Sequence, residues 1–310
     1  MLKYYGVKTY YNLHIGEIVM DTISALLLLV SISLSAGRNI LSKGISGVKF
    51  GHRPYFIIQA VTFAVGTVLL FSINPTAFVG LTATTATYAV IYAILMITAQ
   101  WCYLGALNSG IVSVCATMYS MGFIIPTLMG MIAWSEAVTP RKLIGILTVI
   151  PVIVLSGMKK EEKYADAKKS GKFLIPMVIA MLASGTMGII QKLLALSGNN
   201  EQTPAFVIIA FIIATVVSLV SALLTRGEVI PDMKRKLVFS SGIGICYASC
   251  NFINTILTGR IESSIFFPTL NISIIVLSML LGILFFKEKL GKKQAAILML
   301  GILSILLITL

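Results

Sequence analysis

Apolar runs of about 20 residues recur along the whole chain and are separated by short polar or basic loops. A run of this length crosses the hydrocarbon core of a bilayer as an α-helix. Only 11% of the 310 residues are charged and 57% are hydrophobic, whereas a soluble protein carries about 25% charged residues. The sequence therefore predicts an all-α polytopic membrane protein. Ten spans are expected, at about 20–41, 55–71, 84–107, 111–134, 140–156, 173–196, 204–224, 237–257, 264–286 and 294–310.

One hairpin pattern occurs twice, about half a chain apart. Residues 131–150 read MIAWSEAVTPRKLIGILTVI, and residues 282–300 read GILFFKEKLGKKQAAILML. In both segments an apolar run ends at a glutamate, a short basic turn follows, and the next apolar run begins. The shift that aligns Glu136 with Glu288 also aligns Gly130 with Gly282. Self-similarity at a fixed distance indicates an internal duplication.

The first spans of the two halves match as well, SAGRNILSK at 35–43 and SGTMGIIQK at 184–192. Each half is expected to hold five helices. Because five is odd, the second copy would insert upside down, and inverted repeats place a central cavity with the substrate site between the halves, near the midplane. The expected domains are a first repeat at 1–157 with a polar N-terminal segment at 1–19, a charged linker at 158–172, and a second repeat at 173–310.

Polar residues inside the spans fall at helical spacing. Tyr247, Asn251 and Asn254 repeat along one face of the eighth span. Lipid offers such groups no partner, so they are expected to face the bundle interior or a water-filled cavity. The alternative is an interhelical hydrogen bond that only holds the bundle together. The candidate substrate-binding residues are Arg38, Gln100, Tyr103, Thr117, Tyr119, Gln191, Tyr247, Asn251, Asn254 and Asn271.

These candidates have different expected roles. The amide side chains would hydrogen-bond a substrate, and the tyrosines, with Tyr92 beside them, would form aromatic walls or else pack with a tethered hydroxyl. Arg38 lies deeper in its span than Lys192 and is the better candidate for meeting an anionic group. Lys192 is expected to extend to the membrane interface, as long basic side chains do near helix ends. Glu136 and Glu288 lie at helix ends and are expected to be solvated and structural.

The chain resembles the drug/metabolite transporter superfamily, in its ten-helix EamA-type branch. The resemblance covers essentially the whole chain. It rests on the layout of five plus five helices, on the hairpins SEAVTPRKLIG and KEKLGKKQAAI, and on small-residue first spans that end in Lys43 and Lys192. It implies transport by alternating access through a cavity lined by helices one, three, four, six, eight and nine. It also suggests an amino-acid-like substrate, efflux, and a chain that works as a monomer.

Other classes of function find little support. All eleven acidic residues lie at span ends or in loops, so no buried carboxylate is expected of the kind that four-helix multidrug members use for cations. A neutral, zwitterionic or anionic metabolite fits better. Both histidines lie outside the spans, and no catalytic, nucleotide or metal-binding motif is present. We therefore expect no enzyme activity, no cofactor and no metal. The alternative to a transporter is a nontransporting receptor or scaffold.

The net charge of +13 does not indicate a nucleic-acid partner, because most basic residues lie in short loops, where they orient membrane proteins. The expected partners are a small-molecule metabolite and the lipid bilayer, in the cell membrane. Most of the basic residues follow spans one, five, seven and nine. This distribution places the termini outside the cell, whereas members of the family usually keep both termini in the cytoplasm. The orientation therefore stays open.

Overall fold

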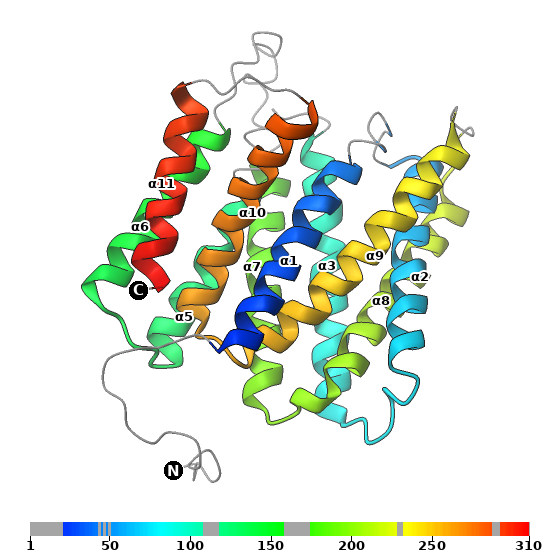
Figure 1. Ribbon diagram of the computed structural model, residues 1–310. Coiled ribbons are helices and arrows are strands. Elements are labelled where there is room, and N and C mark those ends of the chain that lie inside the picture. Colours follow the sequence, from blue (N-terminus) through cyan, green and yellow to red (C-terminus); the bar gives the residue numbers. More distant parts are fainter. Residues whose placement is uncertain are drawn as a thin grey trace.

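The computed structural model describes residues 21–42, 45, 48, 51–107, 118–157, 174–227, 232–286 and 292–309. These residues form helices and contain no strand (Figure 1). The all-helical architecture predicted from the apolar runs is confirmed. The α-helices are α1 (Thr22–Ser42), α2 (Arg53–Ile73), α3 (Ala83–Leu107), α5 (Ile124–Ala133), α6 (Pro140–Gly157), α7 (Leu174–Leu196), α8 (Thr203–Leu224), α9 (Met233–Thr258), α10 (Ser263–Phe286) and α11 (Lys292–Thr309), with 3-10 turns η2 (Met121–Phe123) and η4 (Asn200–Gln202).

The helices have the length and composition of membrane spans. Within the described residues, seven helices are long and apolar enough to cross a bilayer, and two shorter apolar helices cover Met118–Ala133 and Ala295–Thr309. Large apolar side chains also point outward, among them Leu26 and Leu29 on α1 and Leu223 on α8. Soluble proteins rarely expose extended apolar surfaces, whereas lipid is a favourable environment for them. The chain is a polytopic membrane protein.

The fourth predicted span is the least regular of those described. Residues 118–120 are helical, η2 follows, and α5 begins at Ile124. Pro126 has no backbone N–H and so cannot donate to the carbonyl of Gly122, four residues earlier. The irregular turn therefore lies where the sequence removes a helical hydrogen bond. The first part of this predicted span, 111–117, lies outside the described residues.

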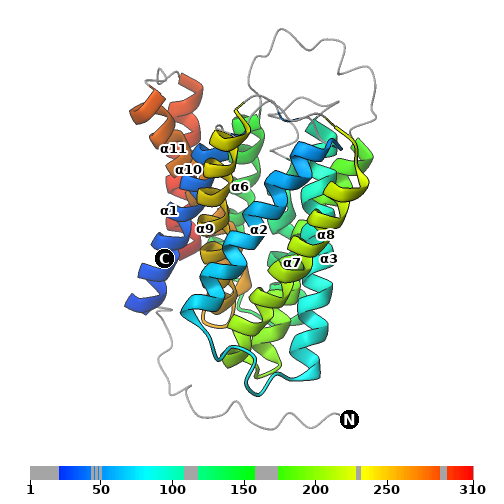
Figure 2. The same ribbon diagram turned by 90° about the vertical axis from the view of Figure 1, so that its right-hand side faces the viewer.

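Helices of one half pack mainly against helices of the other half (Figures 1 and 2). In the first half, α1 contacts α9 and α10; in the second half, α7 contacts α3 and α5. Since α7 would correspond to α1, α9 to α3 and α10 to α5, exchanging the halves reproduces these contacts. The helices α1 and α7 also run in opposite directions (Figure 1). This symmetry supports the proposal of two inverted five-helix repeats.

Small residues bring the halves close together. Thr62 on α2 and Ser240 on α9 share a hydrogen bond of 2.8 Å between their hydroxyls, and the Ser240 hydroxyl also donates to the Ile58 carbonyl at 2.7 Å. A side chain at Gly244 would collide with the backbone of Thr62. Close approach of this kind, with hydrogen bonds across it, is how helices associate in a bilayer.

Candidate substrate site

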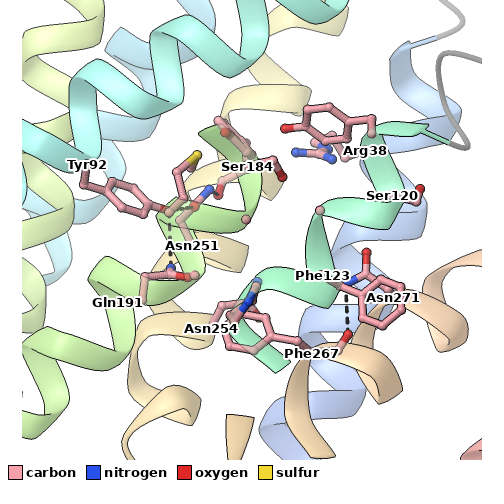
Figure 3. A pocket seen from close by; sticks show the side chains of 17 residues that line it. Arg38, Tyr92, Ser120, Phe123, Ser184, Gln191, Asn251, Asn254, Phe267 and Asn271 are labelled. Atoms are coloured by element: carbon pink, nitrogen blue, oxygen red, sulfur yellow. Dashed lines mark hydrogen bonds between the residues drawn. The ribbon is translucent and has the colours of Figure 1, made fainter. Parts of the chain in front are cut away.

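A cavity of about 160 Å³ lies between the two halves (Figure 3). For scale, a cavity of about 150 Å³ accommodates a molecule of the size of benzene. Its walls come from α1, α3, residues 119–123, α5, α7, α9 and α10. These are the helices one, three, four, six, eight and nine that the resemblance implied. The cavity therefore has the size for one small organic molecule and is built by both halves of the chain.

One wall is a hydrogen-bond network that joins three helices. The Tyr92 hydroxyl on α3 donates to Oδ1 of Asn251 on α9 at 2.5 Å. Nε2 of Gln191 on α7 donates to the Tyr92 oxygen at 3.3 Å and to Oγ1 of Thr255 at 2.9 Å. The Asn251 amide nitrogen also donates to the Tyr247 carbonyl at 2.8 Å. Asn251 thus lines the cavity and holds the bundle together at the same time.

Two further amides are only partly engaged by the protein. Oδ1 of Asn254 accepts a hydrogen bond from the Ser31 hydroxyl on α1 at 2.6 Å. Nδ2 of Asn271 donates to the Phe267 carbonyl, one turn earlier on α10, at 2.9 Å. Among the described residues, the Asn254 amide nitrogen and the Asn271 amide oxygen have no partner. A ligand in the cavity could therefore accept a hydrogen bond from the Asn254 amide nitrogen and donate one to the Asn271 amide oxygen.

Arg38 supplies the charge of the cavity. It is half-buried on α1, and its guanidinium carbon lies 4.8 Å from the centroid of the Tyr247 ring. No other lining residue among those described carries a charge. Figure 3 shows Arg38, Ser120 and Asn271 on the opposite side of the cavity from Tyr92, Gln191 and Asn251. The cavity therefore has a positive side and a neutral, amide-rich side.

Two glycines allow the wall at η2 to form. A Cβ added to Gly185 on α7 would come within 2.5 Å of the Gly122 carbonyl oxygen, and one added to Gly122 would come within 2.8 Å of the Met181 carbonyl oxygen. The backbones of α7 and η2 are thus in direct contact. Gly122 and Gly185 both line the cavity, so this close approach determines its shape on that side.

The structure separates the predicted site residues into three groups. Gln100 and Tyr103 are described but do not line the cavity, and Thr117 lies outside the described residues. Tyr103 packs on Tyr119 with ring centroids 4.9 Å apart. The predicted residues that line the cavity are Arg38, Tyr119, Gln191, Tyr247, Asn251, Asn254 and Asn271.

Height along α3, not helical face, distinguishes Tyr103 from Tyr92. The two residues share a face but lie three turns apart, roughly 16 Å along the axis. The periodicity of the sequence shows the face and not the height. Several apolar lining residues, among them Phe123, Met187 and Phe267, were not predicted. No polar signal distinguishes them from ordinary lipid-facing or packed residues.

A cluster of four charged residues lies where α7 ends, α5 connects to α6, and α10 begins; these helix ends are at the lower end of the bundle in Figure 1. We call it the lower charged cluster: Glu136, Lys142, Lys192 and Glu262. The Glu136 carboxylate accepts the backbone N–H of Ser263 at 2.7 Å and that of Ser264 at 2.8 Å. These are the first residues of α10, where a helix favours negative charge.

The two lysines complete the lower charged cluster. Nζ of Lys192 lies 3.7 Å from Oε1 of Glu136 and donates to the Ile261 carbonyl at 3.3 Å. Nζ of Lys142 lies 2.6 Å from Oε2 of Glu262 and donates to the Ala137 carbonyl at 2.7 Å. Lys192 directly follows Gln191, which lines the cavity. These contacts bind the connection before α6 to the turn before α10.

Two expectations from the sequence are corrected here. The Glu136 side chain is only 7% exposed rather than solvated, and the Lys192 side chain is 12% exposed and points to Glu136 rather than to an interface. Gly130 makes room for this arrangement, because a Cβ at that position would collide with the Glu136 carboxylate. Each charge is paired because the fold brings the opposite charge to it.

Comparisons with known proteins agree with this geometry. Residues 171–310, which include α7 to α11, match the EamA-like transporter family. The second half of the chain is thus similar to EamA-like transporters. This match confirms the resemblance to the drug/metabolite transporter superfamily. The fold itself is shared over almost the whole chain: one solved crystal structure of a protein superimposes with a TM-score of 0.76 at 15% identity, over 93% of this chain and 97% of that chain. No curated protein matches.

Proposed function

We propose that the chain is a secondary transporter that moves one small polar organic metabolite across a membrane by alternating access. The observation that carries the proposal is the polar cavity between the halves, whose walls come from both of them. A substrate bound there touches the parts that must move relative to one another. An amino-acid-like molecule fits the volume and the mixture of amide, aromatic and basic groups. The chain would act as a monomer in the cell membrane, without enzymatic activity.

The lower charged cluster supports alternating access. It joins the first half to the second half through hydrogen bonds and ion pairs. Inverted-repeat transporters work by rocking one bundle against the other around a fixed site. In this proposal the cluster holds one end closed and separates when the substrate leaves by that end.

The test is reconstitution of the full-length protein into liposomes that contain a panel of amino acids, organic acids, sugars and nucleotides. The expected result is saturable flux of one class of compound, accelerated by the same compound on the opposite side. Folded protein without flux above that of empty liposomes for any compound would favour the receptor or scaffold alternative. Stoichiometric product formation would favour an enzyme.

A further inference from the structure

We propose that Arg38 forms a carboxylate subsite, so that the substrate of the cavity carries a carboxylate that pairs with the Arg38 guanidinium. The inference rests on the proposed transport function and specifies the chemical class of its substrate. It follows from three features: the environment of Arg38, the donors that the cavity offers, and the absence of a carboxylate among the described residues that line the cavity.

The first feature is that Arg38 has no carboxylate partner in the part of the chain that the structure describes. The ion pairs of the lower charged cluster join Lys142 to Glu262 and Lys192 to Glu136, and they leave Arg38 out. Among the described residues, the interaction of the guanidinium is with the face of Tyr247, 4.8 Å away. A positive charge within a membrane span is expensive and normally has a negative partner. A ring face supplies part of that stabilisation, and an anion supplies more.

The second feature is the geometry of the donors. A guanidinium presents a planar fork of N–H groups that matches the two oxygens of a carboxylate. The Arg38 guanidinium carbon lies over the Tyr247 ring, and a ring face is not a hydrogen-bond partner that occupies all five N–H groups of a guanidinium. The Asn254 amide nitrogen, which has no acceptor among the described residues, lines the same cavity. The cavity therefore offers a carboxylate two sets of donors, the N–H groups of Arg38 and the Asn254 amide nitrogen.

The third feature is that no described residue of the cavity wall carries a negative charge that could pair with a cation. The acceptors around the cavity are neutral, such as the amide oxygen of Asn271 and that of Gln191. These oxygens can accept hydrogen bonds from an ammonium or hydroxyl group. They carry no negative charge, so they cannot offset the repulsion between Arg38 and a cationic ligand. An amine without a carboxylate is therefore excluded. An amino acid and a simple carboxylic acid both carry the carboxylate that pairs with Arg38, so both are expected to bind.

The experiment compares ligands that differ only in this group. Thermal stability of the purified full-length protein is measured with alanine, leucine and phenylalanine, and with the deaminated acid, the amide and the amine that match each of them. The carboxylates of one size are expected to stabilise the protein, whereas the amides and amines of the same size are not. The shift depends on bound ligand and its concentration, so it reports affinity.

Three variants assign the effect to Arg38. In Arg38→Gln the carboxylate affinity is expected to fall on the order of 10- to 100-fold, the value of a charge-assisted hydrogen bond. Arg38→Lys keeps the charge without the fork and is expected to be intermediate. Arg235→Gln is the matched control, because Arg235 also lies over a ring, that of Phe239 at 5.8 Å, but outside the cavity. It is expected to bind as the wild type does.

The carboxylate subsite is overturned by any of three results. The first is that an amide or amine stabilises the wild type as well as the matching carboxylate does. The second is that a carboxylate still stabilises Arg38→Gln as much as it stabilises the wild type. The third is that no carboxylate stabilises the wild type. Folding of Arg38→Gln is checked by its unliganded melting temperature, and Arg38→Lys provides the second variant. Saturable flux of a neutral metabolite in liposomes would reject the subsite and leave the transport function standing.

Discussion

Oε1 of Glu136 lies 2.7 Å from the backbone nitrogen of Ser263, although the two residues are 127 positions apart in the chain. Glu136 follows α5 in the first half, and Ser263 begins α10 in the second half. The contact therefore joins the halves at one end of the cavity. Under the proposed alternating-access mechanism this hydrogen bond must break whenever that end opens, which leads to two predictions about the lower charged cluster.

Glu136→Gln is expected to destabilise the protein. The neutral amide loses the ion pair with Lys192. One of the two carboxylate oxygens that accept a backbone N–H becomes an NH2 group, which cannot accept that hydrogen bond. Hydrogen bonds to charged groups contribute about 1.5–3 kcal/mol each, so the melting temperature should fall by several degrees. Thermal unfolding in detergent measures the change. Glu201→Gln, at an exposed carboxylate in η4, is the control and should melt as the wild type does. Equal melting of both variants would contradict the stabilising role of Glu136.

Cross-linking across the lower charged cluster is expected to stop transport. In the wild type, Nζ of Lys142 lies 2.6 Å from Oε2 of Glu262. In a background without the native cysteines, the double variant Lys142→Cys/Glu262→Cys is treated with a short, reducible reagent that links two thiols. Because the link holds that end closed, flux into liposomes should cease and should return after reduction. Either single-cysteine variant treated with the same reagent is the control. Undiminished flux in the cross-linked protein would show that this end does not open.

Asn251→Ala is expected to abolish transport while the protein still inserts and folds. The change removes the acceptor of Tyr92 and a polar group of the cavity wall. Tyr92→Phe removes the same hydrogen bond but keeps Asn251, and should lower stability by about 1 kcal/mol while flux persists. Flux in liposomes and thermal unfolding distinguish the two effects. Normal flux in Asn251→Ala would remove Asn251 from the site.

Gly185→Ala is expected to be strongly disruptive for so small a change. Its Cβ would come within 2.5 Å of the Gly122 carbonyl oxygen, and backbone cannot move aside as a flexible side chain does. Overpacking of this kind costs about 1–3 kcal/mol, and the cavity wall shifts with it. Gly37→Ala is the matched control, since a Cβ there would have no neighbour within 4 Å. The melting temperature and the flux should both fall in Gly185→Ala and stay at the wild-type values in Gly37→Ala.

The orientation in the membrane is tested at the two ends of α8. Glu201 and Asp232 are exposed acidic residues that lie before and after this helix. In a background without native cysteines, each is replaced by cysteine and treated on whole cells with an impermeant thiol reagent. The distribution of basic residues predicts labelling of Glu201→Cys on intact cells and of Asp232→Cys only after permeabilisation. The reverse pattern would place both termini in the cytoplasm.

Local patterns in the sequence were enough for most of the helices and for part of the cavity. Tyr247, Asn251 and Asn254 could be assigned to one helical face because their spacing is a property of a single helix. The same logic placed Gln191 and Asn271 toward the interior. Tyr103 shows the limit of this reasoning: its face was predicted, but its distance along α3 from the cavity depends on where the other helices cross.

The amino-acid sequence by itself determined that this protein spans a membrane as helices, because apolar length and the need to satisfy backbone hydrogen bonds in lipid leave no other solution. It also determined which side chains would be costly to place in lipid. Only the tertiary structure decided their partners. Glu136 is buried rather than solvated, and Lys192 is paired with it rather than extended to an interface. Glu136 depends on a turn 127 residues away, and Lys192 depends on a carboxylate more than fifty residues away. Interactions at such distances follow from packing rather than from periodicity.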